Sequence, residues 1–236
     1  MPIRLLAFDK TGSNIRLIGR NEIFTCILPG VFSKTADPKF QLEWTAAERL
    51  KDMHDTWSVN TLYRQNRMRE LLQGAVEQSV DYAILSHTWI RDTPGDVVFQ
   101  DWATREHMSR GNTKIVKFCE VAARNHDVTL GWIDTVCINK DSSSELDESI
   151  RSMYNWYRGA SVCVAYLSET VDICGAHRDS WFTRGWTLQE LLAPAHSVFY
   201  NRDWEQLGPS SDTEKATPKY NLPSKKQAGS PAESWS

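Results

Sequence analysis

The stretch LGWIDTVCINKDSSSELDESIRSMYNWYRGASVCVAYLS, residues 130–168, decides the class of fold. It opens with Leu130–Ile138, which is apolar on both alternating faces except at two central positions, and it closes with the apolar run Val162–Leu167. Such runs are typical of strands that are covered on both faces. Between them, Ser142 and Glu145 form a capping-box pattern that predicts the start of a helix. An apolar stripe at helical spacing follows the cap, made of Leu146, Ile150, Met153, Trp156 and Tyr157.

The same alternation continues on both sides of this stretch. Upstream, the short apolar run Tyr82–Leu85 predicts a strand, and apolar residues at helical spacing around Phe118 predict the helix that follows it. Downstream, Trp186–Leu192 predicts a short helix ended by a proline, and Ser197–Tyr200 a last strand. Strands that alternate with helices predict an α/β fold, a mostly parallel sheet with helices on both faces and right-handed crossovers.

The chain divides into four segments by composition and pattern. The first holds two short apolar stretches, Ile3–Phe8 and Ile15–Ile18, around Gly12, and this arrangement predicts a hairpin. A weaker amphipathic pattern predicts a helical insertion, and a final stretch rich in Ser, Pro, Lys and Ala has too few apolar residues to order itself. The predicted segments are an N-terminal hairpin at 1–29, the helical insertion at 30–80, the core domain at 81–207 and a disordered polar tail at 208–236.

Composition excludes several classes of protein. The 236 residues are 41% hydrophobic and 24% charged, with a net charge of −3, which gives no electrostatic basis for binding nucleic acid or anionic lipid. No apolar run approaches the ~20 residues of a membrane span, and the charged N-terminus leaves no room for a signal-peptide core. The five cysteines are scattered without a CxxC pair, so we expect reduced thiols and a cytoplasmic protein. Neither histidines nor cysteines show the spacing of metal ligands, so no metal site is expected.

Polar residues lie where the predicted strands stop. In a parallel sheet of this kind, ligands bind outside the carboxyl ends of the strands, near a reversal in strand order. The rule selects residues after three predicted strands, namely Ser86, His87, Trp89, Asp134, Asn139, Ser168 and Glu169.

Three separated segments resemble the fungal heterokaryon-incompatibility (HET) domain. They are YAILSHTW at 82–89, residues 132–168, and WFTRGWTLQELLAP at 181–194. The chain differs from the usual family pattern at Ile90, where the family has glycine, and in about fifty residues before the first segment. The resemblance implies a role in fungal programmed cell death on non-self recognition. It also implies self-association or a partner incompatibility protein.

A more distant resemblance concerns the chemistry. The order VCVAYLSE, a spacer and GWTLQELL is similar to the strand and W-C-L-x-E-L helix of Toll/interleukin-1 receptor (TIR) domains. This likeness implies a TIR-like, flavodoxin-like sheet. In enzymatic TIR domains the glutamate of that helix is catalytic in NAD cleavage, and the likeness carries this role to Glu190. NAD or a related nucleotide is then a candidate substrate, and no separate cofactor is implied.

The residue chemistry of Glu190 fits that role. Trp186 lies four positions earlier, so both side chains share one helical face. Nicotinamide departs from NAD as a neutral group, so the site must mainly stabilise the oxocarbenium-like ribosyl centre, which an ionised carboxylate can do. The predicted site has Glu190 as the key carboxylate and His87 as a general base, with Ser86, Trp89, Asp134, Asn139, Arg184 and Trp186 as nucleotide-binding residues.

Each of these residues also has a structural interpretation that involves no catalysis or ligand binding. Glu190 can instead pair with Arg184 or Arg158, His87 can hydrogen-bond loop backbone, and Asp134 can cap a turn or orient His87. At the level of the whole chain, the first hypothesis is an NAD glycohydrolase, and the second is a non-enzymatic death-signalling module that acts through self-association. Three tryptophans that lie in or beside apolar stripes are expected in the core, namely Trp132, Trp156 and Trp181.

Overall fold

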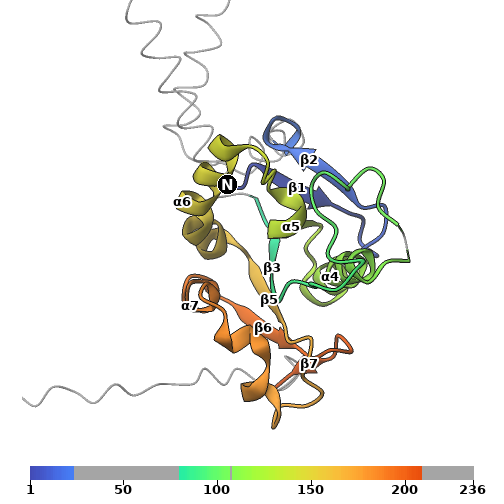
Figure 1. The fold of residues 1–236 in the computed structure, drawn as a ribbon, viewed down its shortest axis with the longest axis vertical. Helices are drawn as coiled ribbons and strands as arrows, with labels where there is room; N and C mark the ends of the chain where they lie inside the picture. Colours follow the sequence, from blue (N-terminus) through green and yellow to red (C-terminus); the bar gives the residue numbers. More distant parts are fainter. Residues whose placement is uncertain (24–79, 107, 209–236) are drawn as a thin grey trace, which may run out of the picture.

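The computed structural model describes residues 1–23, 80–106 and 108–208 (Figure 1). The predicted helical insertion and polar tail therefore lie, except for their edge residues, outside the described part of the chain.

A seven-stranded sheet forms the centre of the described residues, in the order β2-β1-β4-β3-β5-β6-β7. Four neighbouring strands are parallel, and they are β4 (Leu130–Trp132), β3 (Ala83–His87), β5 (Val162–Tyr166) and β6 (Ser197–Tyr200). The outer strands pair antiparallel, and they are β1 (Arg4–Ala7), β2 (Arg16–Gly19) and β7 (Gln206–Leu207).

The parallel strands have the connectivity of a doubly wound sheet. Numbered along the chain, β3, β4, β5 and β6 lie side by side in the order 2-1-3-4, which is the flavodoxin-type order. The order reverses between β3 and β5, so the segments that follow these two strands leave the sheet at its switch point. The predicted α/β fold with a mostly parallel core is confirmed.

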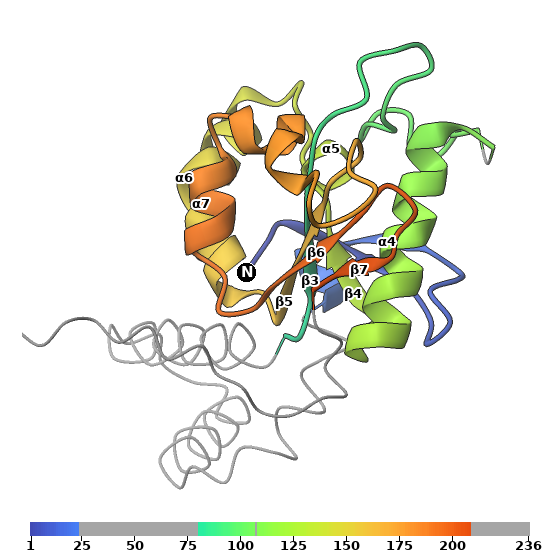
Figure 2. The ribbon, with the colours of Figure 1, turned by 90° about the horizontal axis from the view of Figure 1, so that it is seen from below.

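Helices cover both faces of this sheet. Figure 2 shows α4 (Arg110–His126) on one face, and α6 (Ser143–Gly159) with α7 (Thr187–Leu192) on the other. The predicted cap of α6 is present in part, because the Ser142 hydroxyl accepts from the Glu145 backbone N–H, whereas the Glu145 carboxylate binds Arg4 and the backbone of Asn139. Two short 3-10 turns, Ala176–Arg178 and Ser180–Thr183, lead into α7.

The predicted N-terminal hairpin is confirmed and belongs to the main sheet. β1 and β2 pair in register from Arg4–Gly19 to Ala7–Arg16, and β1 also pairs with β4. Gly12 occupies the turn at φ +81°, a left-handed conformation that glycine adopts without strain.

The single strand predicted over Leu130–Ile138 is wrong in its second half. β4 ends at Trp132, and Asp134–Cys137 forms a short helix, α5, in which the Cys137 backbone N–H donates to the Ile133 carbonyl at 2.8 Å. A short apolar run predicts burial but does not distinguish a strand from a buried helical turn.

The three expected core tryptophans are confirmed. Trp132, Trp156 and Trp181 are almost fully buried. Trp132 meets the rings of Trp156 and Tyr157 edge-on, with ring centroids 5.7 and 6.0 Å apart. Such edge-to-face contacts add to the free energy of burial and hold α6 against the sheet.

Candidate functional site

Two cavities adjoin at the carboxyl edge of the parallel strands. The first, of about 550 Å³, lies between the segment after β3, the α5–α6 region and α7. The second, of about 840 Å³, lies over the switch point between β3 and β5. Four residues line both cavities, namely Thr88, Trp89, Arg91 and Arg184.

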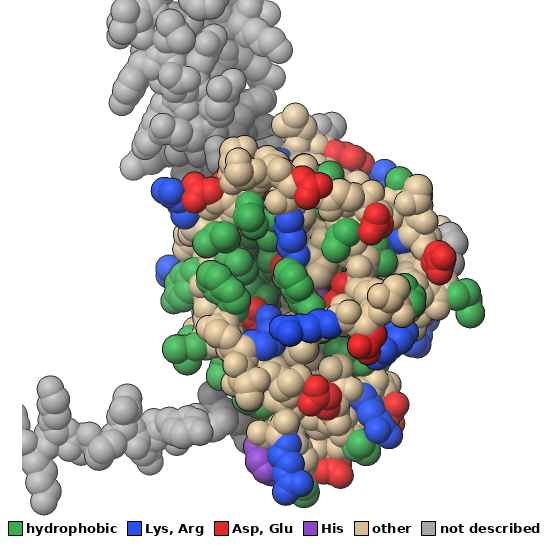
Figure 3. Space-filling view, in the orientation of Figure 1, with side chains coloured by type: hydrophobic (Ala, Val, Ile, Leu, Met, Phe, Trp, Pro, Cys, Tyr) green, Lys and Arg blue, Asp and Glu red, His purple; other side chains and the backbone are tan. Residues whose placement is uncertain are grey.

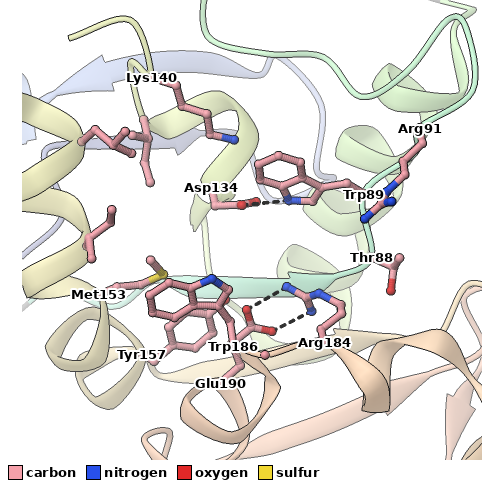
Figure 4. Close-up of a pocket in the computed structure, with 14 residues that line it drawn as sticks. Thr88, Trp89, Arg91, Asp134, Lys140, Met153, Tyr157, Arg184, Trp186 and Glu190 are labelled. Carbon is pink, nitrogen blue, oxygen red and sulfur yellow. Dashed lines mark hydrogen bonds and ion pairs between the residues drawn. The ribbon is translucent and has the colours of Figure 1, made fainter. Parts of the chain in front are cut away.

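The first cavity has one apolar wall and one polar wall (Figure 4). Figure 3 shows apolar side chains gathered around a hollow over α6 and α7, with basic side chains beside it. The apolar wall consists of Ile138, Leu146, Ile150, Met153, Tyr157 and Trp186. The polar wall consists of Asp134, Lys140 and Glu190 together with the shared residues.

Glu190 reaches the first cavity from α7, but its carboxylate is paired. Two guanidinium nitrogens of Arg184 donate to the two carboxylate oxygens at 2.9 Å each, and the Ser86 hydroxyl donates to Oε2 at 2.5 Å. The side chain is only 5% exposed. The sequence left Arg184 and Arg158 open as partners of Glu190, and in the structure the partner is Arg184. Glu190 therefore lines the cavity as part of an ion pair.

Ser86 lies behind the cavity and does not line it. Its hydroxyl accepts from the Trp181 indole N–H at 2.6 Å and gives its own hydrogen to Glu190. With donor and acceptor roles both used, the fully buried hydroxyl positions the Glu190 carboxylate.

His87 is also buried behind the lining residues. Its Nε2 lies 3.1 Å from Asp134 Oδ1, and its Nδ1 lies 2.8 Å from Lys114 Nζ. Because a lysine ammonium only donates, Nδ1 is the acceptor and Nε2 carries the hydrogen that binds Asp134. His87 therefore lines neither cavity, and the structure places it as an orienting group for Asp134.

Asp134 connects this buried network with the first cavity. Its second oxygen accepts from the Trp89 indole N–H at 2.9 Å. Burial acts to raise the pKa of Asp134, but the hydrogen bond from His87, the charge of Lys140 and the hydrogen bond from Trp89 outweigh burial and lower the pKa. The carboxylate therefore stays ionised and holds the half-exposed Trp89 ring at the boundary of the two cavities.

Two lysines belong to the same network and were not predicted. Lys114 binds Asp96 at 2.5 Å, and burial lowers its pKa against the opposing charge of Asp96. The ammonium of Lys140 lies 3.7 Å from the centroid of the Trp89 ring, and burial likewise lowers its pKa. A sequence signal for Lys114 exists, because it lies on the apolar face of α4 beside Ile115.

The remaining predicted residues divide between the two cavities. Trp186 lines the first cavity, and Ser168 and Glu169 line the second. Asn139 lines neither, because its side chain binds Gln100 and the backbone of Asp141. Within the described residues, no group of three or more His, Cys, Asp or Glu side chains could hold a metal ion. No helix in this part of the chain is long and apolar enough to cross a bilayer.

Comparison with known proteins finds a family that part of this α/β core resembles. Residues 82–179 match the family model described as "Heterokaryon incompatibility protein (HET)". This match supports a HET domain over residues 82–179.

One relative extends this match. Over 148 residues the chain is 37% identical to "Vegetative incompatibility protein HET-E-1" of Podospora anserina, which covers 57% of this chain and 11% of the relative. The matched part is thus about a tenth of that protein's length. No solved structure matches the chain.

Proposed function

We propose that this HET domain acts in heterokaryon incompatibility, where it triggers cell death by cleaving NAD to nicotinamide and an ADP-ribose product. The 37% identity to a vegetative incompatibility protein supports the biological part. The observation that carries the chemical part is the position of the Glu190 carboxylate, which is paired with Arg184 and lines the first cavity beside the half-exposed indole of Trp186.

In the proposed reaction the bond between the ribosyl C1′ and the nicotinamide nitrogen breaks, and its electron pair leaves with neutral nicotinamide. Water adds to C1′ and releases a proton. The developing positive charge on the ribosyl centre is stabilised by Glu190, which Arg184 and Ser86 hold in position. Trp186 and Trp89, which are 48% and 46% exposed, offer faces for the nicotinamide ring. Of the predicted catalytic residues, His87 acts here only through Asp134.

The direct test follows nicotinamide release from NAD by the full chain and by Glu190→Gln, which keeps the shape and removes the charge. We expect a loss of about 100-fold or more, the scale of removing one electrostatic contact to a transition state. Glu148→Gln on α6 is the matched control, because its exposed carboxylate pairs with Arg20 and lines neither cavity. Unchanged activity in a folded Glu190→Gln variant would remove Glu190 from the mechanism.

A second candidate function is supported by a separate observation. Leu188 and Leu192 on α7 are each 67% exposed, and Tyr154 on α6 is 48% exposed. Exposed apolar side chains gathered on neighbouring helices are typical of interaction surfaces. On this alternative, the domain signals death by self-association without chemistry.

We expect Leu188→Glu to weaken any self-association about tenfold or more, because it places a charge on the apolar surface. Sedimentation of the full chain over a range of concentrations measures the change. Lys117→Glu on α4, a charge change on the opposite face of the sheet, is the control. Equal self-association of Leu188→Glu and the unmodified chain would exclude this surface.

A further inference from the structure

The second cavity lies where doubly wound sheets bind ligands. Segments that follow β3 and β5 form two of its walls, the first turns of α4 form a third, and the turn between β6 and β7 closes it. The reversal of strand order at β3 and β5 opens a crevice between the connections that leave to opposite faces. Four shared residues join this cavity to the one that holds Glu190.

Basic side chains outnumber acidic ones among the residues that line the second cavity, although the chain has a net charge of −3. Three acidic residues line it, namely Asp92, Glu169 and Asp203, against six basic residues, namely Arg91, Arg110, Lys114, Lys117, Arg184 and Arg202. Most of the basic groups are engaged in ion pairs, for example Arg110 with Asp92 at 3.6 Å. Arg91 is the exception within the described residues, because no carboxylate there pairs with it.

A buried hydroxyl without a partner lies on the same segment as Arg91. Thr88 lines both cavities, and its Oγ1 atom is buried and has no hydrogen-bond partner among the described residues. Figure 4 shows Thr88 and Arg91 together at one end of the first cavity, on the chain that continues from β3. A buried polar atom without a partner requires an explanation, and an anionic oxygen of a ligand provides one.

A rigid aromatic pair lines the other part of the cavity. The rings of Tyr166 and Trp204 stack with centroids 4.2 Å apart and an interplanar angle of 11°. Trp204 has φ +63°, a left-handed conformation that is rare for a bulky side chain. The buried side chain of Asn201 holds this turn, because its carbonyl accepts from two backbone N–H groups and its amide donates to Val171. A strained residue held this firmly is characteristic of ligand sites.

We propose that the second cavity binds the adenosine diphosphate part of a nucleotide. The diphosphate binds Arg91 and Thr88 at the junction of the two cavities, and adenine stacks on the Tyr166–Trp204 pair. The inference rests on the proposed function. In that function the first cavity binds the nicotinamide end of NAD, and the second cavity would bind the adenosine diphosphate end. Its test measures binding and does not require turnover.

The experiment titrates ADP and inorganic pyrophosphate into the full chain by calorimetry. We expect Arg91→Gln to weaken both ligands about tenfold, because it removes a charge-assisted contact to phosphate. Trp204→Gly tolerates the left-handed backbone and removes the stacking face, so we expect about tenfold weaker ADP binding and pyrophosphate binding within about twofold. Trp204→Phe keeps an aromatic face and retains ADP binding within about threefold.

Arg151→Gln is the matched charge control, because its side chain is 77% exposed on α6 and lines neither cavity. The proposal is overturned if ADP does not bind, if Arg91→Gln binds ADP as the unmodified chain does, or if Trp204→Gly does so. If Trp204→Gly weakens both ligands alike, Trp204→Phe decides: retained ADP binding supports the stacking role, and its loss with pyrophosphate binding retained overturns it.

The outcomes separate this inference from the proposed function. ADP binding without nicotinamide release upholds the inference and counts against NAD cleavage. Nicotinamide release without ADP binding supports NAD cleavage and overturns the inference. NAD binding to Glu190→Gln that is no tighter than ADP binding identifies a free nucleotide, rather than NAD, as the ligand of the second cavity.

Discussion

Arg184 fixes the position of the Glu190 carboxylate in the first cavity. The guanidinium binds both carboxylate oxygens from a position six residues earlier, and both side chains are largely enclosed. Removal of one partner leaves the other charge in a poorly solvated place, which costs more than the net contribution of the intact pair.

At this pair we expect Arg184→Gln to lower the free energy of unfolding by about 2–4 kcal/mol, since the Glu190 carboxylate would remain buried with Ser86 as its remaining hydrogen-bond partner among the described residues. Urea unfolding measures the change. Arg151→Gln, which breaks an exposed pair with Asp147, should cost less than about 1 kcal/mol. Equal costs for the two variants would show that the Glu190–Arg184 pair is solvated.

At the scale of single elements, close packing requires a glycine at position 12, in the turn of the hairpin formed by β1 and β2. Its turn lies against α4, and a Cβ atom at Gly12 would stand 2.4 Å from the backbone nitrogen and Cα of Glu120. The turn is also tied together by Asp9, whose carboxylate accepts from Thr11, Ser13 and Asn14. Glycine at this position thus permits both the turn and its contact with the helix.

We expect Gly12→Ala to destabilise the chain by about 2–4 kcal/mol, because a left-handed backbone and a backbone clash act together. Gly19→Ala in β2 is the control, since no atom lies within 4 Å of its added Cβ, and it should change the stability by less than about 1 kcal/mol. Thermal and urea unfolding measure both variants. A Gly12→Ala protein as stable as Gly19→Ala would contradict the close approach of turn and helix.

Across the whole molecule, stability depends on how α4 packs on the sheet. His126, in the last turn of α4, lies 3.1 Å from the Tyr200 hydroxyl on β6. Burial lowers the pKa of His126 below the ordinary value of 6.5. The folded state thus keeps the neutral imidazole at pH values where the unfolded chain takes up a proton.

It follows that this contribution is fully present above pH 6.5 and is lost as the pH falls below that value. We expect the free energy of unfolding to decrease between pH 8 and pH 5, and to decrease less in His126→Gln. Urea unfolding at several pH values measures both slopes. Identical slopes for the two proteins would contradict the shift in His126.

Much of the fold and only part of the site followed from the sequence. Local spacing predicted α6, β5 and the hairpin, because the apolar pattern of an element repeats within a few residues. The same spacing predicted the core positions of Trp132, Trp156 and Trp181. α5 was missed because Asp134–Cys137 lies within a short, mostly apolar run, and such a run does not distinguish a strand from a buried helical turn.

The amino-acid order was enough to establish the alternation of strands and helices, and the polar residues that follow each strand, because both depend on neighbours in the chain. The tertiary structure alone decided that Lys114 contacts His87 and that Arg184, not Arg158, pairs with Glu190. It also decided that Trp204 stacks on Tyr166 of β5. These contacts depend on which strand ends and loops share one edge of the sheet, and that proximity arises only when the doubly wound order assembles.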